Sequence, residues 1–262
     1  MFHTVFATRF IRRMTNGRTV PCLIECEDDS GQKHELVVKF SANMFEKEKN
    51  LAIEAIVAIL ASDLNLPVPE PFLVELSSIF VDQMIDQEVK DTMQKSCSLA
   101  FGSLHVKHYS SWIKDQKIKR EMTQSASEVL LFDAIIRNAD RRPSNPNCLF
   151  LGDSLCIFDH ELALTSRFFW QDPWEGGGLK DIVDGEKHIF ARPYFEKRPS
   201  NFDRFVDAWS VVTDERIEEY KRTLPAKWVV GNEQAIDEIM VYFKQVRSNI
   251  RIITENALKE LG

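Results

Sequence analysis

The chain has 262 residues and a formal net charge of −7, with 44% apolar and 28% charged residues. This is ordinary globular composition, which excludes a collagen-like, coiled-coil or largely disordered chain. The negative charge argues against nonspecific nucleic-acid binding, and we expect no direct DNA binding.

No apolar run approaches the roughly 20 residues that cross a membrane. The basic residues of segment 1–14 follow its apolar ones, which is the reverse of a signal peptide. The five cysteines are odd in number and form no CxxC pair, which indicates reduced thiols and a cytoplasmic protein. Cys22 and Cys26 share one face of a predicted strand, where two packed thiols are expected rather than half a metal site.

The first 85 residues are expected to form a small β lobe with one helix. Alternating and β-branched stretches predict strands over residues 4–13, 20–27 and 35–40, with two more within 72–84. Asn43 is expected to cap a helix over residues 44–63, which Pro67 and Pro69 terminate because proline lacks a backbone donor.

Helical patterns are expected to dominate residues 86–262. Segment 121–138 is apolar nearly all round and predicts a deeply buried helix. A proline-broken loop is expected over residues 140–147, followed by a short hairpin over residues 148–158. Residues 165–188 predict a long irregular loop, and residues 200–222 and 231–260 predict C-terminal helices.

The loop after the buried helix has the clearest chemical pattern. Asp140 is followed by Asn145 five residues later, and Asp159 ends the predicted hairpin. A carboxylate can orient a hydroxyl and accept its proton, and an amide oxygen with a second carboxylate suits Mg²⁺. The pattern therefore indicates phosphoryl transfer. The structural alternative is an Asp/Asn/Pro turn whose side chains cap backbone groups.

Lys39 lies in an apolar strand, from which it could reach the α- and β-phosphates of a nucleotide if a helix carboxylate held it. Glu54 is the expected partner because it lies among apolar residues, where an uncompensated carboxylate is costly. Glu48 is the substitute. The alternative is an edge-strand lysine that faces water.

The turn from Thr15 to Pro21 contains a single glycine, Gly17, and so falls short of a glycine-rich nucleotide loop. Its backbone amides could still cradle phosphate, with Arg18 and Thr19 as additional donors. A plain hairpin turn is the alternative.

With these motifs, the chain resembles the HipA-like kinases, bacterial Ser/Thr kinases with a protein-kinase-like two-lobed fold, and more distantly the phosphatidylinositol kinases. The resemblance spans residues 8–165 and is carried by RFIRRMTNGRTVP, ELVVKF, LNLPVPEPF, DAIIRNADRRPSNPNCLF and LCIFDHELAL. It implies an α+β fold with a small antiparallel β N-lobe containing one helix, residues 1–85, and a larger, mainly helical C-lobe, residues 86–262.

The same resemblance implies an ATP- and Mg²⁺-dependent kinase that phosphorylates a Ser or Thr of a protein. It implies Asp140 as the catalytic base, Asn145 and Asp159 as metal ligands, and Lys39, braced by Glu54, as the lysine that pairs with the phosphates. The turn residues Gly17, Arg18 and Thr19 would contact the nucleotide. A translation factor or tRNA synthetase as target, and an antitoxin partner, are expectations of the same kind.

Two other functions fit the same residues. A small-molecule phosphotransferase would share this catalytic pattern. A nucleotide-binding pseudokinase or interaction module is disfavoured because all four catalytic positions are filled. A closed acidic pocket would favour a small cationic acceptor, and an open basic cleft would favour a protein or RNA-bound target.

Overall fold

The computed structural model describes residues 2–14, 19–114, 116–164, 171–179, 187–199 and 201–261. Its contacts divide the chain into two compact units. The first contains Met1–Ile56, Pro69–Lys107 and Arg222–Ile236, and the second contains Val57–Val68, His108–Lys221 and Asp237–Gly262. The simple boundary at residue 85 stays a prediction. No helix in the described part of the chain is long and apolar enough to cross a membrane.

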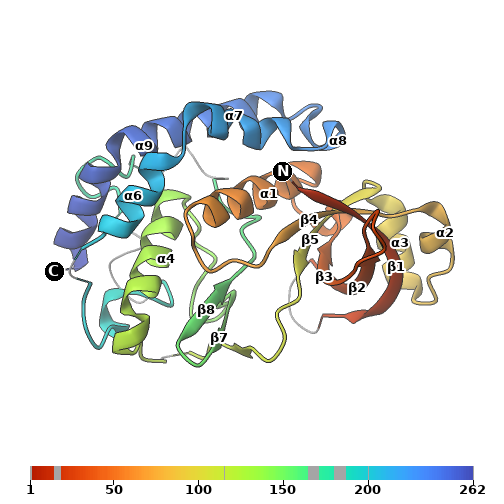
Figure 1. Ribbon diagram of the computed structural model, residues 1–262, viewed down its shortest axis with the longest axis horizontal. Helices are drawn as coiled ribbons and strands as arrows, with labels where there is room; N and C mark the ends of the chain where they lie inside the picture. Colours follow the sequence, from red (N-terminus) through yellow and green to blue (C-terminus); the bar gives the residue numbers. More distant parts are fainter. Residues whose placement is uncertain are drawn as a thin grey trace. The chain divides into compact units, whose positions relative to one another are not determined.

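A closed five-stranded barrel forms most of the first unit (Figure 1). Its strands, in spatial order, are β1 (His3–Arg13), β2 (Cys22–Glu27), β3 (Lys33–Lys39), β5 (Leu99–Leu104) and β4 (Pro71–Glu75). All neighbouring pairs are antiparallel except β1 and β4, which are parallel. The predicted antiparallel pairing is therefore confirmed for four of the five neighbouring pairs and is wrong for β1 and β4, the pair that closes the barrel.

Alternate side chains of the strands fill the barrel, as the period of a strand requires. Fully buried examples from four strands are Val5, Ile24, Leu36, Val38 and Val74. Cys22 and Cys26 are also buried, and burial raises the pKa of both thiols to about 12. This agrees with packed, unreactive thiols, and all five cysteines are free.

The first unit contains more helix than expected. The 3-10 turn η1 (Ser41–Asn43) precedes α1 (Glu48–Asp63), of which residues 48–56 belong to this unit and residues 57–63 to the second. Helices α2 (Ser78–Asp82), α3 (Gln87–Lys95) and α8 (Ala226–Val229) follow along the chain. Asn43 lies in η1 and does not cap α1. Its side-chain amide instead donates to the carbonyl of Thr19 at 3.0 Å.

Segment 72–84 contains one strand rather than two. Ser77 accepts a hydrogen bond from the backbone of Phe80 at 3.1 Å and so caps α2, which replaces the second predicted strand. Downstream, α3 and β5 were also missed, although β5 is the barrel strand between β3 and β4. The apolar alternation of β5 is short, and Gly102 interrupts it.

The second unit contains a small sheet and several helices. Its sheet has the order β6 (Ser110–Ser111), β7 (Cys148–Leu151) and β8 (Ser154–Ile157). The remaining elements are η2 (Arg120–Met122), α4 (Thr123–Ile135), η4 (Arg192–Tyr194), α6 (Asp203–Val211), α7 (Asp214–Arg222) and α9 (Glu233–Leu261). The predicted buried helix, hairpin and C-terminal helices are confirmed. The predicted loop 165–188 lies largely outside the described residues.

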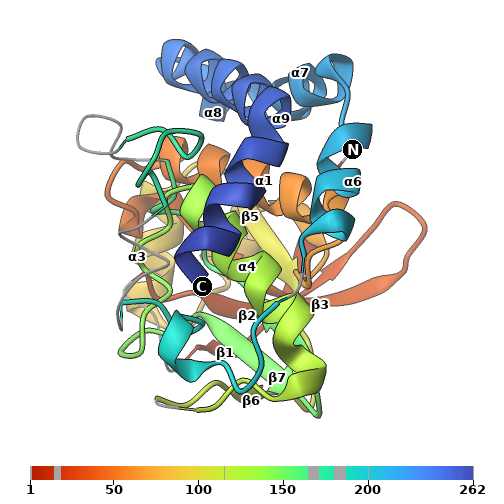
Figure 2. The ribbon, with the colours of Figure 1, turned by 90° about the vertical axis from the view of Figure 1, so that its left-hand side faces the viewer.

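Helix α4 is buried over eleven of its residues, as its all-round apolar pattern indicates. Helix α9 runs beside α4 (Figures 1 and 2), and the hydroxyl of Tyr242 donates to the carbonyl of Ile135 at 2.6 Å. Helix α6 packs on α9 through the rings of Trp209 and Phe243, whose centroids are 6.4 Å apart. These contacts fix the C-terminal end of α4, from which the candidate catalytic loop emerges.

Candidate active site

Lys39 is the last residue of β3, and its side chain is only 8% exposed. Its Nζ lies 3.2 Å from Oε2 of Glu54, whose side chain is 4% exposed on α1. Burial of either charge alone would be costly, so each stabilises the charged form of the other. The strand lysine and the helix carboxylate are therefore brought together as the sequence predicts.

Glu48 has a different partner. Its Oε1 accepts a hydrogen bond from the hydroxyl of Ser41 at 2.8 Å, which ties the start of α1 to η1. Of the three turn residues expected to contact the nucleotide, Gly17 and Arg18 lie outside the described residues, as does Thr15. Thr19 is 3% exposed, so its hydroxyl does not face open solvent.

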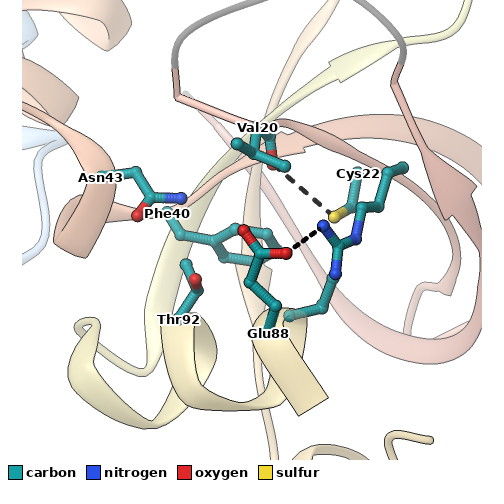
Figure 3. A pocket seen from close by; sticks show the side chains of 8 residues that line it. Val20, Cys22, Phe40, Asn43, Glu88 and Thr92 are labelled. Carbon is teal, nitrogen blue, oxygen red and sulfur yellow. Dashed lines mark hydrogen bonds and ion pairs between the residues drawn. The ribbon is translucent and has the colours of Figure 1, made fainter. Parts of the chain in front are cut away.

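A pocket of about 130 Å³ lies in the first unit beside Val20, where the chain enters β2 (Figure 3). Arg13, Cys22, Phe40, Asn43 and three residues of α3 complete its lining. The guanidinium of Arg13 is already paired with Asp86 and with Glu88, the latter at 2.6 Å. Arg13 is the only cation among the described residues that line the pocket, and two carboxylates neutralise it, so these residues are poorly suited to bind a phosphate group.

In the second unit, Asp140 and Asn145 face each other across the tight loop that follows α4. The side-chain amide of Asn145 donates to Oδ2 of Asp140 at 2.8 Å, and that of Asn147 donates to the same oxygen at 3.4 Å. A guanidinium nitrogen of Arg142 lies 3.6 Å from Oδ1. Because the side-chain nitrogen of Asn145 faces Asp140, the side-chain oxygen of Asn145 is the atom that could bind a metal ion.

The β7–β8 hairpin brings Asp159 to the same end of the unit as this loop. The backbone amide of Phe158 donates to the carbonyl of Asn147 at 3.2 Å and so closes the base of the hairpin. Asn147 and Asp159 adopt left-handed φ angles of +42° and +64°, which Asn and Asp tolerate better than most residues. Such backbone geometry is frequent at functional sites.

The electrostatics of Asp140 reflect this arrangement. Partial burial raises the pKa of its carboxyl, and the nearby negative charge of Asp159 raises it further, while Arg142 and the two asparagines oppose this. A higher pKa makes the carboxylate a stronger proton acceptor than an ordinary surface aspartate.

Glu161 is an additional acidic residue of this site that the sequence did not single out as a ligand. One of its carboxylate oxygens lies within 4.8 Å of one of Asp159, and its side chain is buried. The carboxylate oxygens of Asp159 and Glu161 are of the kind that a hard cation such as Mg²⁺ prefers. In the sequence, Glu161 could have been found only from its position two residues after Asp159, and this Asp-x-Glu spacing is too common to indicate a metal ligand.

Arg141 supports the candidate catalytic loop from the interior of the second unit. It is fully buried, and its Nε donates to Oδ2 of Asp133 on α4 at 2.6 Å. Its guanidinium also donates to the carbonyls of Asn147 and, at 3.1 Å, of Phe158. One side chain therefore joins α4, the end of the catalytic loop and the residue before Asp159. Sequence reasoning missed it because a second consecutive arginine, Arg142, gives no sign of which one is buried.

His188 completes this buried group. Its Nδ1 accepts a hydrogen bond from the backbone of Phe190 at 3.0 Å, so its Nε2 carries the proton and donates to Asp133 at 2.9 Å. Burial lowers the pKa of His188, which keeps the ring neutral. Burial alone would raise the pKa of Asp133, but Arg141 and His188 outweigh it and hold that pKa below its usual range.

Comparisons with known proteins gave one family match and a structural match. A family model described as HipA-like kinase matches residues 7–261. The crystal structure of the Helicobacter pylori proinflammatory kinase CtkA matches 99% of this chain and 98% of its own, with a TM-score of 0.57 and 12% sequence identity. A comparison with curated protein sequences found no match. The structural likeness confirms the predicted fold class, an α+β protein-kinase-like fold with an N-terminal β-sheet and a helical C-terminal part.

Proposed function

Because this chain belongs to the HipA-like kinase family, we propose that it transfers the γ-phosphate of ATP to a Ser or Thr hydroxyl of a protein. Kinase family membership implies a phosphotransferase, and the proposal adds the acceptor and the residues. The observation that supports it most is the hydrogen bond from the side-chain amide of Asn145 to Oδ2 of Asp140, at 2.8 Å. The charge of Asp159 also raises the pKa of Asp140.

Asp140 acts in this proposal as the base that orients the acceptor. Its Oδ2 is occupied by the two asparagine amides, so Oδ1 is the oxygen available to accept the hydroxyl proton. As the acceptor oxygen bonds to the γ-phosphorus and the bond to the β-γ bridging oxygen breaks, that proton passes to Asp140. Orientation of the hydroxyl matters more than proton removal in a loose phosphoryl-transfer transition state.

The metal ligands follow from the donors already described. Asn145 would supply its amide oxygen and Asp159 a carboxylate oxygen, with Glu161 as a further carboxylate. When bound, Mg²⁺ supplies charge neutralisation of the phosphate oxygens. Arg141 keeps these ligands in place because its hydrogen bonds fix the backbone at Asn147 and Phe158.

Lys39 is proposed to bind the α- and β-phosphates, with Glu54 fixing the direction of its ammonium group. The side chain of Lys39 is already ordered by Glu54 before the nucleotide binds, which lowers the entropic cost of binding. Thr19, Gly17 and Arg18 keep their proposed role as nucleotide contacts. A translation factor or tRNA synthetase as target, an antitoxin partner and a cytoplasmic location stay predictions.

The test is transfer of labelled phosphate. Purified protein is incubated with γ-labelled ATP, MgCl₂ and casein as a generic protein acceptor, and the acid hydrolysate is analysed for phosphoamino acids. We expect label in phosphoserine or phosphothreonine that disappears when EDTA replaces Mg²⁺. Release of all label as inorganic phosphate, or its transfer only to an added aminoglycoside or choline, would contradict a protein acceptor.

A further inference from the structure

Arg137 lies two residues beyond the end of α4 and has a left-handed φ of +58°. The backbone amide of Asn138 donates to the carbonyl of Asp133 at 2.8 Å, and that of Arg137 donates to the carbonyl of Ala134 at 3.4 Å. This pattern closes many helices, and its left-handed residue is usually glycine, because a Cβ is disfavoured there. An arginine at this position is therefore expected to gain stabilisation from contacts of its side chain.

The Arg137 side chain is buried, only 5% exposed, and its charge is compensated on two sides. Its Nη2 lies 3.0 Å from Oδ1 of Asp172. Its guanidinium carbon lies 5.2 Å from the centre of the Tyr242 ring on α9. A carboxylate and an aromatic face both stabilise a buried cation, so these contacts offset the cost of the left-handed backbone at residue 137.

Asp172 is presented by a compact turn over residues 171–179, which we call the docked turn. The backbone amide of Glu175 donates to the carbonyl of Asp172 at 2.9 Å, and that of Gly178 donates to the carbonyl of Glu175 at 3.1 Å. A Cβ at Gly178 would collide with the carbonyl oxygen of Asp172, so the turn requires glycine there. The backbone of the docked turn therefore fixes where Asp172 lies.

The docked turn also packs on α9. The centroids of the Trp174 and Tyr242 rings are 6.0 Å apart, and the side-chain amide of Asn256 donates to the carbonyl of Trp174 at 3.5 Å. The hydroxyl of Tyr242 in turn donates to the carbonyl of Ile135 at the end of α4. Arg137, the docked turn and α9 therefore form one group of contacts at the C-terminal end of α4.

This group of contacts is continuous with the candidate catalytic loop. The backbone amide of Leu164, in the segment after the β7–β8 hairpin, donates to the carbonyl of Ile136 at 2.9 Å. On the other side of Arg137, the side chain of Asn138 accepts a hydrogen bond from the backbone amide of Asp140 at 3.2 Å. A change of the backbone at residue 137 would therefore displace the proposed base.

We propose that Arg137, paired with Asp172, is a positioning residue that fixes the orientation of Asp140 toward the acceptor hydroxyl. This inference rests on the proposed kinase activity and adds a residue pair on which the rate of that reaction depends. Phosphoryl transfer needs close alignment of the acceptor, so a small displacement of Asp140 lowers kcat. Because Lys39, the proposed phosphate ligand, belongs to the first unit, the affinity for Mg²⁺–ATP should change far less than kcat.

The first measurement is the rate of phosphate transfer from γ-labelled ATP to casein, with the Kd of Mg²⁺–ATP determined by calorimetry. We expect Arg137→Gln to lower kcat by about tenfold and to change that Kd by less than about twofold. Asp172→Asn alters a half-exposed carboxylate, which should leave folding intact, and is expected to lower kcat to a similar extent. The double variant should be no slower than either single variant, because both changes remove the same ion pair.

Two further variants separate positioning from stability. Arg137→Lys should keep kcat within about threefold of wild type, because a single nitrogen of Arg137 pairs with Asp172 and an ammonium group can also lie over an aromatic ring. The matched control is Arg204→Gln, which breaks the ion pair between Arg204 on α6 and the buried Glu128 of α4. It should lower the midpoint of urea unfolding and leave kcat unchanged.

Hydrogen–deuterium exchange gives a readout that needs no activity. Because the amide of Asp140 is hydrogen-bonded to Asn138, we expect the peptide that contains it to exchange faster in Arg137→Gln than in wild type, and at the wild-type rate in Arg204→Gln. Wild-type kcat in Arg137→Gln or Asp172→Asn, unchanged exchange at Asp140 in Arg137→Gln, or an equal loss of kcat in Arg204→Gln overturns the proposal. If exchange increases as expected but wild type transfers no phosphate to any protein, the proposed function fails and the link from Arg137 to the loop stands.

Discussion

Asp133 shows how one buried residue organises the candidate site. Its two carboxylate oxygens accept from Asn138, Arg141 and His188, at distances from 2.6 to 3.3 Å. The Asn138 side chain in turn accepts from the backbone amide of Asp140 at 3.2 Å. Asp133 therefore acts on Asp140, the proposed catalytic carboxylate, through the side chain of Asn138, and is a positioning residue in this proposal.

The neutral His188 should make the stability of the protein depend on pH. Its pKa is lowered in the folded state by burial, and Arg141 lowers it further, whereas the hydrogen bond to Asp133 opposes this. The unfolded chain therefore takes up a proton first as the pH falls below the ordinary histidine value of about 6.5. The contribution of neutral His188 to the free energy of unfolding is therefore fully present above that pH and is lost progressively as the pH falls below it.

We expect the His188→Gln variant to lose less unfolding free energy than wild type between pH 7 and pH 5. Glutamine can still donate to Asp133 but cannot titrate. The measurement is urea unfolding followed by tryptophan fluorescence at several pH values. Between pH 7.5 and 8.5 the difference between the two proteins should stay constant, and parallel curves down to pH 5 would contradict the assigned role.

At the scale of elements, the Lys39–Glu54 pair connects β3 to α1. Removal of one partner leaves a buried charge, so Lys39→Met is expected to lower the unfolding free energy by about 3–5 kcal/mol. The double variant Lys39→Met/Glu54→Leu should recover much of that loss because no charge stays buried. Chemical denaturation of the two single variants and the double variant measures the coupling.

The exposed pair of Lys33 and Glu25 on neighbouring strands is the matched control. Their charged atoms are 3.1 Å apart, a distance similar to that of the buried pair, but the Lys33 side chain is 62% exposed. We expect Lys33→Met to change stability far less than Lys39→Met, since water screens the exposed pair. Equal losses of unfolding free energy in Lys33→Met and Lys39→Met would show that the cost of breaking the Lys39–Glu54 pair does not come from its burial.

Gly102 explains why β5 can lie between β3 and β4. A Cβ at this position would be 2.7 Å from a methyl carbon of Val74 and 3.1 Å from one of Leu36. We expect Gly102→Ala to destabilise the protein by about 1–3 kcal/mol through overpacking. The double variant Gly102→Ala/Val74→Ala should cost less than the sum of the two single changes, as measured by thermal unfolding. Additive losses would argue against a direct clash.

Elements with a strong local period could be predicted, and elements whose state depends on distant contacts could not. The all-round apolar pattern of α4 and the β7–β8 hairpin were predicted within a few residues. Short α2 depends on one capping serine, and β5 pairs with strands at least 24 residues away in sequence. The parallel pairing of β1 with β4 is likewise set by closure of the barrel rather than by local sequence.

For the molecule as a whole, the candidate site was predicted where residue types alone define the chemistry. Asp140, Asn145 and the Lys39–Glu54 pair were named from spacing and from the cost of a buried charge, and the structure places both pairs in contact. The buried support of Arg141 and His188 was missed because their partner, Asp133, lies within an apolar helix.

In the proposed function, Asp140 acts in phosphoryl transfer and not in binding of the nucleotide. The direct measurement is the rate of γ-phosphate transfer to a protein by wild type, Asp140→Asn and Asp207→Asn, an exposed aspartate on α6, with Mg²⁺–ATP affinity determined in parallel by calorimetry. We predict that Asp140→Asn binds Mg²⁺–ATP like wild type but transfers phosphate at least about a hundredfold more slowly, and that Asp207→Asn is unchanged in both. Transfer by Asp140→Asn at the wild-type rate would contradict the account.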